Sequence, residues 1–470
     1  MRKHMILCGI LLLSLALRSP YLFQESVWND ETVYMWIGSR ISQNFAFLLT
    51  PYPAFHSYGY LFDIVIAFFS ALLKDPFVAS RIAVLFFSLL GIAVVFFALE
   101  RSLGIEAAIT GALLLAFNPV YSFISCRSLL DVPLAAVTAL LGFSFLLNSP
   151  PITGAIIALL PFTKVAGIVP ASIGYLFLIE DALRAWREGK GVKKYVKGLA
   201  VASIGLLLFF TLNYVFFGSP FRPGGARIGP GSIFTGSRFY YVENAGIVYG
   251  SFIILLLALI GGYFSLENKP FFRIFSVFLI YFLFFSLFVG EMVPRYILPT
   301  VPLAIMLAMF GGIKLIEKAG GNRKIVLLLL LLLPLELNTS LGLLNAKKYT
   351  YTGFQELGEK VAELDKIYNF STVYAQSMRQ IRAFSGIEYK SNGGKISSLP
   401  KKLEELANKT NILLQLDIWE YTAPEWAYPL TQEKLNRILA LNFSVVHVVY
   451  REYPSQQGVQ KVPVGMLLDK

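Results

Sequence analysis

Long apolar runs recur along the first three quarters of the chain, separated by short polar stretches. A run of about 20 apolar residues can cross a membrane as one helix. The candidate spans are 5–23, 58–73, 78–99, 106–118, 119–127, 130–147, 152–163, 165–180, 197–217, 246–265, 271–290, 296–316 and 324–343. Several runs between residues 106 and 180 are shorter, so we expect broken or tilted helices there. The pattern predicts a polytopic α-helical membrane protein with about 11–13 transmembrane segments.

The chain becomes more polar after residue 344, and its hydrophobic pattern changes. Helical and strand-like patterns now alternate, which is typical of a small sheet with helices packed on it. The expected elements are a helix at 354–368, a strand at 371–376, a helix at 399–409, a strand at 412–418, a helix at 432–441 and a strand at 444–449. The sequence therefore predicts a membrane domain over residues 1–344 and an α/β domain over residues 345–470.

The composition agrees with a membrane protein and narrows the classes of partner. Of the 470 residues, 56% are hydrophobic and 15% are charged, whereas soluble proteins carry about 25% charged residues. The formal net charge is +12, but the basic clusters flank apolar runs, which favours anionic lipid over nucleic acid. Cys8 and Cys126 both lie in apolar runs, so they indicate neither a disulfide framework nor a metal cluster.

The distribution of basic residues predicts the orientation. Basic loops lie preferentially on the cytoplasmic side. With Arg2 and Lys3 in the cytoplasm, loop 24–57 lies outside, and an odd number of spans places residues 345–470 outside. The remaining basic clusters, at 184–197, 269–273 and 314–324, then lie inside. We expect a multi-pass protein of the cell membrane with a cytoplasmic N-terminus and an extracytoplasmic C-terminal domain.

The outer loop 24–57 carries the acidic pair Asp30-Glu31. Adjacent carboxylates at a membrane edge can supply a general base or hold a divalent cation. The alternative is structural, because residues 31–42 have amphipathic helical spacing, and either carboxylate could cap that helix. Position alone leaves both interpretations open.

Ionisable residues also occur within the apolar segments, namely Arg127, Asp131, Lys164 and Arg295. Such groups are costly in a membrane and are functional candidates. Arg127 and Asp131 could instead form a structural ion pair at i, i+4, and Lys164 could extend to the membrane surface. In the predicted topology all four lie at the outer end of their segments, at the same depth as Asp30.

The outer loop 218–245 is rich in glycine and arginine and includes Arg222 and Arg227. It could form a lid over an anionic group or be a flexible solvated loop. Its glycines do not match a nucleotide phosphate-binding loop.

Taken in order, the motifs resemble those of the GT-C superfamily of membrane glycosyltransferases. Within it, the chain is most similar to the dolichyl-phosphate-mannose–protein mannosyltransferases and the lipid A aminoarabinose transferase. The matching stretches are Asp30-Glu31, His56 to Leu61, Ser80-Arg81-Ile82, Asn118-Pro119, Cys126 to Pro133 and Arg295 to Pro299. The two prolines that follow the histidine in the family are absent here, and Cys126 replaces a serine. The resemblance covers about residues 1–345.

The resemblance implies an enzyme that transfers a sugar from a polyprenyl-phosphate or dolichyl-phosphate carrier to a hydroxyl acceptor at the extracytoplasmic face, with inversion. It implies Asp30 as the general base, with Glu31 assisting. Donor phosphate binding would involve Arg127, Lys164, Arg295 and Tyr296, because cations stabilise a phosphate leaving group. Further expected site residues are His56, Asp131, Arg222 and Arg227.

The expected partners are the lipid-phosphate sugar donor, a protein, lipid or glycan acceptor, and membrane lipid, without nucleic acid. We expect no cofactor and no obligatory metal, although a divalent cation is possible. Two alternatives remain. A lipid-linked oligosaccharide transferase would need a Trp-Trp-Asp-Tyr-Gly-like motif, which Asp417 to Tyr421 does not match. A polyprenyl-linked glycan transporter or flippase would predict paired repeats with broken helices, and none is convincing.

Overall fold

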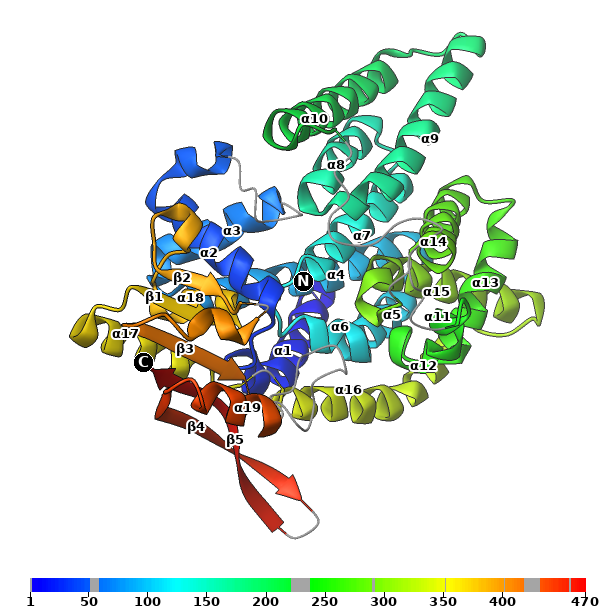
Figure 1. Cartoon of the computed structure of the whole chain (residues 1–470). Helices are drawn as coiled ribbons and strands as arrows, with labels where there is room; N and C mark the ends of the chain where they lie inside the picture. Colours follow the sequence, from blue (N-terminus) through cyan, green and yellow to red (C-terminus); the bar gives the residue numbers. More distant parts are fainter. Residues whose placement is uncertain are drawn as a thin grey trace. The chain divides into compact units, whose positions relative to one another are not determined.

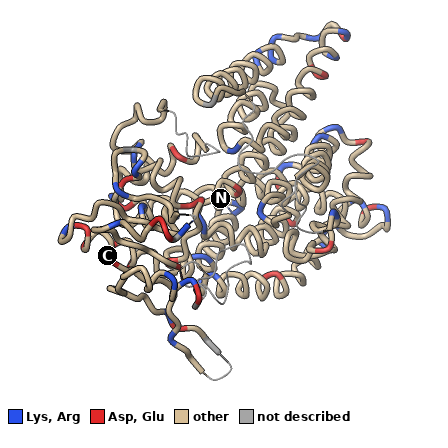
Figure 2. Tube along the Cα trace, viewed as in Figure 1, with Lys and Arg blue, Asp and Glu red and all other residues tan. Residues whose placement is uncertain are grey.

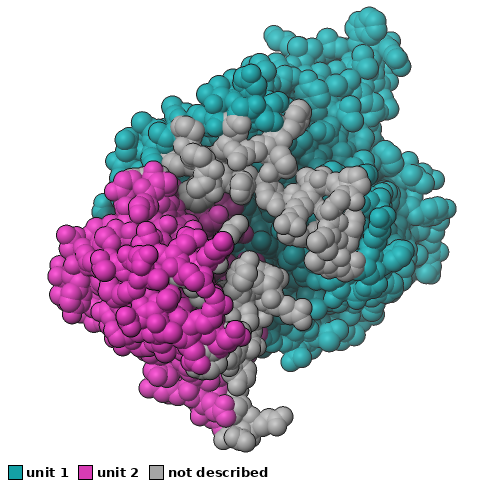
Figure 3. Space-filling model, in the orientation of Figure 1, with its two compact units in different colours: residues 1–22, 37–344 teal, residues 23–36, 345–470 magenta. Residues whose placement is uncertain are grey.

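The computed structural model divides the protein into two compact units (Figure 3). It describes residues 2–50, 59–220, 237–289, 292–350, 352–400, 402–417, 432–455 and 458–470. Unit 1 comprises residues 1–22 and 37–344, and unit 2 comprises residues 23–36 and 345–470. The beginning of the outer loop therefore clusters with the C-terminal segment, whereas the sequence analysis assigned it to the membrane domain.

Unit 1 is helical (Figure 1). Its helices, with α2 and α16 continuing into unit 2, are α1 (Arg2–Leu22), α2 (Asn29–Gln43), α3 (Tyr60–Leu73), α4 (Pro76–Leu103), α5 (Ile105–Phe117), α6 (Pro119–Ile124), α7 (Asp131–Leu147), α8 (Pro150–Thr163), α9 (Ile168–Arg187), α10 (Lys193–Phe217), α11 (Tyr240–Glu243), α12 (Ala245–Val248), α13 (Phe252–Ser265), α14 (Lys269–Phe288), α15 (Val301–Lys318) and α16 (Leu333–Lys347). The 3₁₀ segments are η1 (Phe45–Leu49), η2 (Val165–Gly167), η3 (Pro294–Thr300) and η4 (Arg323–Leu332). Among the described residues, seven helical stretches are long and apolar enough to cross a membrane, and five shorter apolar helices accompany them.

Several helices begin after an Asn or Asp cap and carry a proline in the first turn. Asp75 accepts hydrogen bonds from two backbone N–H groups at the start of α4, and Asn118 accepts one from Tyr121 at the start of α6. Asn268 caps α14 in the same way. A polar N-cap satisfies otherwise unpaired N–H groups, and proline in the first turn loses no helical hydrogen bond. The sequence thus sets these helix starts locally.

Helices α1 and α4 run antiparallel. The Nζ of Lys3, at the start of α1, lies 3.0 Å from a carboxylate oxygen of Glu100, near the end of α4. At the opposite end, the Sγ of Cys126 lies 3.8 Å from the carbonyl oxygen of Arg18. The guanidinium of Arg81, near the start of α4, donates to the carbonyl of Cys126. The end of α1 and the start of α4 therefore lie on the same side of unit 1.

This arrangement corrects the expectation that run 58–73 spans the membrane. The chain between α1 and α4 therefore begins and ends on the same side of the membrane. If α3 alone crossed, the chain would end on the opposite side. Helix α2 is polar on average, so it offers no return crossing. The apolar face of α3 includes the exposed Phe68 and Leu72, which suits a helix lying along a membrane surface.

Without α3, the seven long helices and the four other short apolar helices make eleven candidate crossings in the described chain. The six-residue α6 is too short to add one, although run 119–127 was expected to be a separate segment. This count places the three basic turns, α9–α10, α13–α14 and α15–η4, on the Lys3 side. Figure 2 shows that charged residues are sparse along the helices and gather at such turns. The arrangement agrees with the positive-inside pattern.

Unit 2 contains a five-stranded mixed sheet in the order β2-β1-β3-β5-β4. Its elements are α17 (Phe354–Tyr368), β1 (Thr372–Ala375), α18 (Met378–Ser385), η5 (Lys390–Asn392), β2 (Ile396–Ser398), η6 (Leu403–Leu406), β3 (Ile412–Asp417), α19 (Gln432–Leu439), β4 (Ser444–Ser455) and β5 (Gly458–Asp469). β1 pairs in parallel with β2 and β3, and β5 pairs antiparallel with β3 and β4.

The predicted α/β class of unit 2 is confirmed, but several of its elements differ from the expectation. The helix expected at 399–409 is only the short η6, and α18, β2 and β5 were not predicted. The helix expected at 354–368 is present as α17. Its buried Leu357, Val361 and Leu364 recur at helical spacing, so periodicity was sufficient to find it.

Asp417 is a buried carboxyl at the end of β3 that makes the stability of unit 2 depend on pH. It accepts hydrogen bonds from the Ser377 hydroxyl at 2.5 Å and from the Gln415 amide at 2.6 Å. Burial raises the pKa of Asp417 to about 6 from an ordinary value of 3.8, and these two hydrogen bonds limit the rise. The folded carboxyl therefore holds a proton that the unfolded chain has lost between about pH 4 and pH 6.

Stability should fall as pH rises through this window, by about 3 kcal/mol in total. Asp417→Asn keeps a group that can accept from Gln415 and donate to Ser377, and it should remove this component of the slope. The measurement is the apparent melting temperature of the full chain in detergent at pH values from 4.5 to 7.5. The quantity compared is the difference in melting temperature between variant and wild type at each pH. A difference that does not change with pH would contradict the prediction.

Candidate active site

The two carboxylates of the acidic pair have different surroundings at the start of α2. One carboxylate oxygen of Glu31 accepts a hydrogen bond from the backbone N–H of Trp28 at 2.8 Å. Glu31 is fully buried, and it reaches back over the first turn as in a capping box. The helix-capping role that was the alternative interpretation of the pair is therefore the role of Glu31. Asp30 lies in the same turn but is only partly buried.

Asp131 and Lys164 form an ion pair in unit 1. The Nζ of Lys164 lies 2.7 Å from a carboxylate oxygen of Asp131, whose side chain is 4% exposed. Asp131 begins α7, and Lys164 occupies the break between α8 and η2. The backbone at Lys164 is extended, so the chain turns at this residue. A continuous helix would place the Lys164 side chain elsewhere. The pairing brings together two predicted site residues that lie 33 positions apart in sequence.

Tyr296 lies close to two of the predicted phosphate-binding cations. The Nζ of Lys164 is 5.3 Å from the centre of its ring, and the guanidinium carbon of Arg295 is 5.4 Å from it. The carbonyl of Tyr296 accepts a hydrogen bond from the Tyr281 hydroxyl at 3.2 Å, and the Tyr241 hydroxyl donates to the carbonyl of Val293 at 3.4 Å. The aromatic ring and the cations lie within favourable cation–π range. Two tyrosines thus anchor the η3 segment that carries this group.

Arg127 lies in the loop between α6 and α7, and it is 1% exposed. Its guanidinium packs over the ring of Phe123 at 5.0 Å. The start of α4 holds the loop on both sides of this residue, because Arg81 donates to the carbonyl of Cys126 and the Ser128 hydroxyl donates to Ser80 at 2.7 Å. The Ser80-Arg81 motif therefore positions the Arg127 loop.

Asp63, one turn into α3, is a buried ionisable residue that the sequence analysis did not single out. Both its carboxylate oxygens are buried without a hydrogen-bond partner among the described residues. Close packing of Gly59 against Leu130 places the start of α3 beside α7. Lys164 became a candidate because it is an ionisable residue within an apolar run. Asp63 lies within the apolar run 58–73, so the same criterion could have identified it from the sequence.

Three predicted residues, His56, Arg222 and Arg227, lie outside the described residues. The described residues also contain no group of three or more His, Cys, Asp or Glu side chains that could hold a metal ion. The expectation of no obligatory metal stays a prediction.

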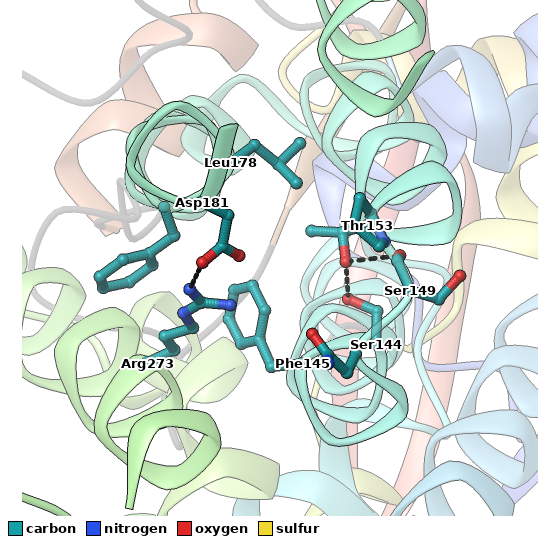
Figure 4. A pocket seen from close by; sticks show the side chains of 10 residues that line it. Ser144, Phe145, Ser149, Thr153, Leu178, Asp181 and Arg273 are labelled. Atoms are coloured by element: carbon teal, nitrogen blue, oxygen red, sulfur yellow. Dashed lines mark hydrogen bonds and ion pairs between the residues drawn. The ribbon is translucent and has the colours of Figure 1, made fainter. Parts of the chain in front are cut away.

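A second polar group in unit 1 lies at the opposite end of α7 from Asp131. Figure 4 shows the pocket, which is lined by Ser144, Phe145, Asn148, Ser149, Pro150, Thr153, Phe177, Leu178, Asp181 and Arg273. Asp181 accepts from Arg273 at 2.5 Å and from Lys269 at 2.6 Å. This cluster ties the end of α9 to the start of α14 on the Lys3 side, so it is separate from the predicted site residues.

No family model matches the chain, and no curated protein sequence matches it. Solved structures do match. ArnT from Cupriavidus metallidurans bound to undecaprenyl phosphate is 14% identical, with a TM-score of 0.64 over 99% of this chain and 97% of that chain. The archaeal oligosaccharyltransferase AglB from Archaeoglobus fulgidus, in complex with an inhibitory peptide and a dolichol-phosphate, is 15% identical, with a TM-score of 0.58 over 98% and 74%.

The arabinofuranosyltransferase AftD from Mycobacteria is 12% identical, with a TM-score of 0.58 over 99% of this chain and 39% of that chain. The likeness to all three structures includes both units, because it covers nearly the whole of this chain. It confirms, for the fold, the resemblance that the ordered motifs predicted. The protein has the fold of the GT-C membrane glycosyltransferases.

Proposed function

We propose that this protein is a membrane glycosyltransferase that moves a sugar from a polyprenyl-phosphate carrier to a hydroxyl acceptor at the extracytoplasmic face. The observation that carries the proposal is the fold, which is similar along 99% of the chain to ArnT bound to undecaprenyl phosphate. The pairing of Lys164 with Asp131 beside Tyr296 supports it, because a membrane protein rarely keeps such groups without a use.

The leaving group in this reaction is a lipid phosphate, which needs positive charge more than it needs a proton. Lys164, Arg295 and Arg127 are assigned to that role. Arginine offers a planar set of donors that matches phosphate oxygens, and lysine adds a compact charge. Asp131 would hold Lys164 in place until the phosphate binds, and the ring of Tyr296 lies near both Lys164 and Arg295. Cations that meet the growing charge on phosphate lower the barrier directly.

The acceptor hydroxyl is a poor nucleophile, and Asp30 is assigned as its general base. The Asp30 carboxylate would remove the hydroxyl proton as the oxygen attacks the anomeric carbon. The bond from that carbon to the phosphate oxygen breaks on the opposite face, so the configuration inverts. Glu31 would act indirectly by fixing the first turn of α2 through its bond to Trp28.

The test is release of the lipid carrier by the purified full-length protein in liposomes. Both reactions contain a cell-membrane extract that supplies hydroxyl acceptors. One receives a polyprenyl-monophosphate sugar, and the other receives a polyprenyl-diphosphate oligosaccharide, the donor class of the oligosaccharyltransferase alternative. We expect release of free polyprenyl phosphate from the first donor only. Release from the second donor only would move the assignment to oligosaccharide transfer. Movement of intact donor across the bilayer without any release would support a transporter and overturn the proposal.

A further inference from the structure

We infer that the C-terminal domain positions Asp30 by holding the chain on both sides of it. The inference rests on the proposed function and assigns a task to residues 345–470. Residues 23–36 form one compact unit with that segment, coloured magenta in Figure 3. Two groups of contacts within unit 2 secure the short segment. The first, here called the Glu25 clamp, consists of Glu25, Ser26, Thr350, Gln355 and Arg451. The second, the Trp36 clamp, consists of Trp36, Arg382, Glu388 and Tyr389.

The Glu25 clamp lies five residues before Asp30. One Glu25 carboxylate oxygen accepts from the backbone N–H of Gln355 at 2.7 Å, and the other accepts from Arg451 at 3.0 Å. The hydroxyl of Ser26 donates to the carbonyl of Thr350 at 2.5 Å. The two hydrogen bonds to the Glu25 carboxylate are charge-assisted, and such bonds are shorter and stronger than neutral ones. The segment is thereby bound to the start of α17 and to β4.

The Trp36 clamp lies six residues after Asp30 on the same helix. The guanidinium of Arg382 stacks over the Trp36 ring at 3.5 Å and over the Tyr389 ring at 4.2 Å. The Arg382 side chain is 4% exposed and lies 3.1 Å from Glu388, which also accepts from the Trp36 indole N–H at 3.4 Å. An arginine buried between two rings holds a fixed orientation, which a lysine could not reproduce.

The clamps restrict the only part of unit 2 that precedes residue 345. Asp30 lies between them, and the cap made by Glu31 stiffens the turn that carries it. Val27 and Tyr34 are also buried, so the segment is held by packing as well as by charge. General-base catalysis depends on geometry within a fraction of an ångström, and a displacement of about 1 Å can cost about 100-fold in rate. The clamp residues supply that precision by holding the segment at both ends, without touching substrate themselves.

Arg382 and Trp36 are therefore positioning residues, and the experiment separates positioning from simple folding. The variants are Arg382→Ala, Arg382→Lys and Trp36→Ala, each also combined with Asp30→Asn. Arg437→Ala is the matched control, because Arg437 forms an exposed ion pair with Glu404 in the same domain. Lipid-phosphate release gives kcat and KM for the donor, and hydrogen exchange of the full chain reports on peptides from 23–36, β1 and β3.

We expect Arg382→Ala and Trp36→Ala to speed exchange in 23–36 and leave exchange in β1 and β3 unchanged. We expect kcat to fall by about 10- to 100-fold with little change in donor KM. Arg382→Lys should recover only a small part of the rate, because it keeps the charge and loses the stack. In the Asp30→Asn background the same changes should lower kcat by less than about twofold. That variant already lacks the base, so moving the side chain at position 30 costs little further rate.

An Arg382→Ala effect as large in the Asp30→Asn background as in the wild type would overturn the inference. Unchanged exchange in 23–36 for both clamp variants would also overturn it. If Arg382→Ala does not fold, Glu25→Gln tests the other clamp by the same readouts. A wild type that releases no lipid phosphate would defeat the proposed function, while the exchange data would still decide whether the clamps hold the segment.

Discussion

Asp30→Asn is expected to lower the rate of sugar transfer by about 10²- to 10⁴-fold, the usual contribution of a general base. Asparagine keeps the size and the hydrogen-bonding shape of the side chain but cannot accept a proton. Because Asp30 is partly exposed in the first turn of α2, the substitution should not alter folding. The measurement is kcat for release of polyprenyl phosphate, alongside the apparent melting temperature in detergent.

Two companion variants sharpen this test. Glu363→Gln changes an exposed carboxylate of the same unit that pairs with Lys360, and it should keep the wild-type rate. Glu31→Gln can still accept from the Trp28 N–H, so a helix-capping role predicts a smaller loss than that of Asp30→Asn. A wild-type rate for Asp30→Asn would remove Asp30 as the base. An equal loss for Glu31→Gln would show that both carboxylates take part in the chemistry.

Lys164→Gln is expected to cost both stability and activity. It leaves the buried carboxylate of Asp131 without its cation, at a cost of about 3 kcal/mol. It also removes a charge assigned to the donor phosphate, so the rate should fall by at least about tenfold. Lys314→Gln is the matched control, because Lys314 forms a more exposed pair with Glu317, and such pairs contribute at most about 1 kcal/mol.

The double variant Asp131→Asn/Lys164→Gln distinguishes the two interpretations of this pair. Two neutral side chains can hydrogen-bond to each other, so most of the lost stability should return. The rate should stay low, because one of the three cations assigned to the donor phosphate is still missing. Recovery of the rate together with stability would show that the pair of Lys164 with Asp131 is structural and that Lys164 does not serve the donor phosphate.

The sequence by itself determined the features that depend on local pattern. Hydrophobic run length identified the spanning helices, since a helix in lipid must satisfy its own backbone and present apolar side chains all round. Helical periodicity located α17, and the change in polarity after residue 344 located the C-terminal α/β domain. The Asn118-Pro119 motif is a helix start whose cap can be recognised from two adjacent residues.

The tertiary structure decided the features that depend on contacts between distant residues. Run 58–73 has the hydrophobicity of a span, and only the Lys3–Glu100 pair together with the Arg81 contact shows that α1 and α4 are antiparallel. Sequence distance likewise concealed the pairing of Lys164 with Asp131. The sequence offered only the alternative of a pair four residues apart, Arg127 with Asp131, because only helical neighbours can be identified without knowledge of packing.

The acidic pair shows both what local sequence determines and what tertiary contacts determine. Adjacency left open which of Asp30 and Glu31 caps the helix, and the resemblance to a family of transferases implied Asp30 as the base with Glu31 assisting. The fold separated them, because the helix that begins at Asn29 turns Glu31 back onto the Trp28 N–H and leaves Asp30 partly exposed. It also placed them in the same compact unit as residues 345–470. Local composition sets which groups can do chemistry, whereas burial and long-range contacts set which of them is held in position to do it.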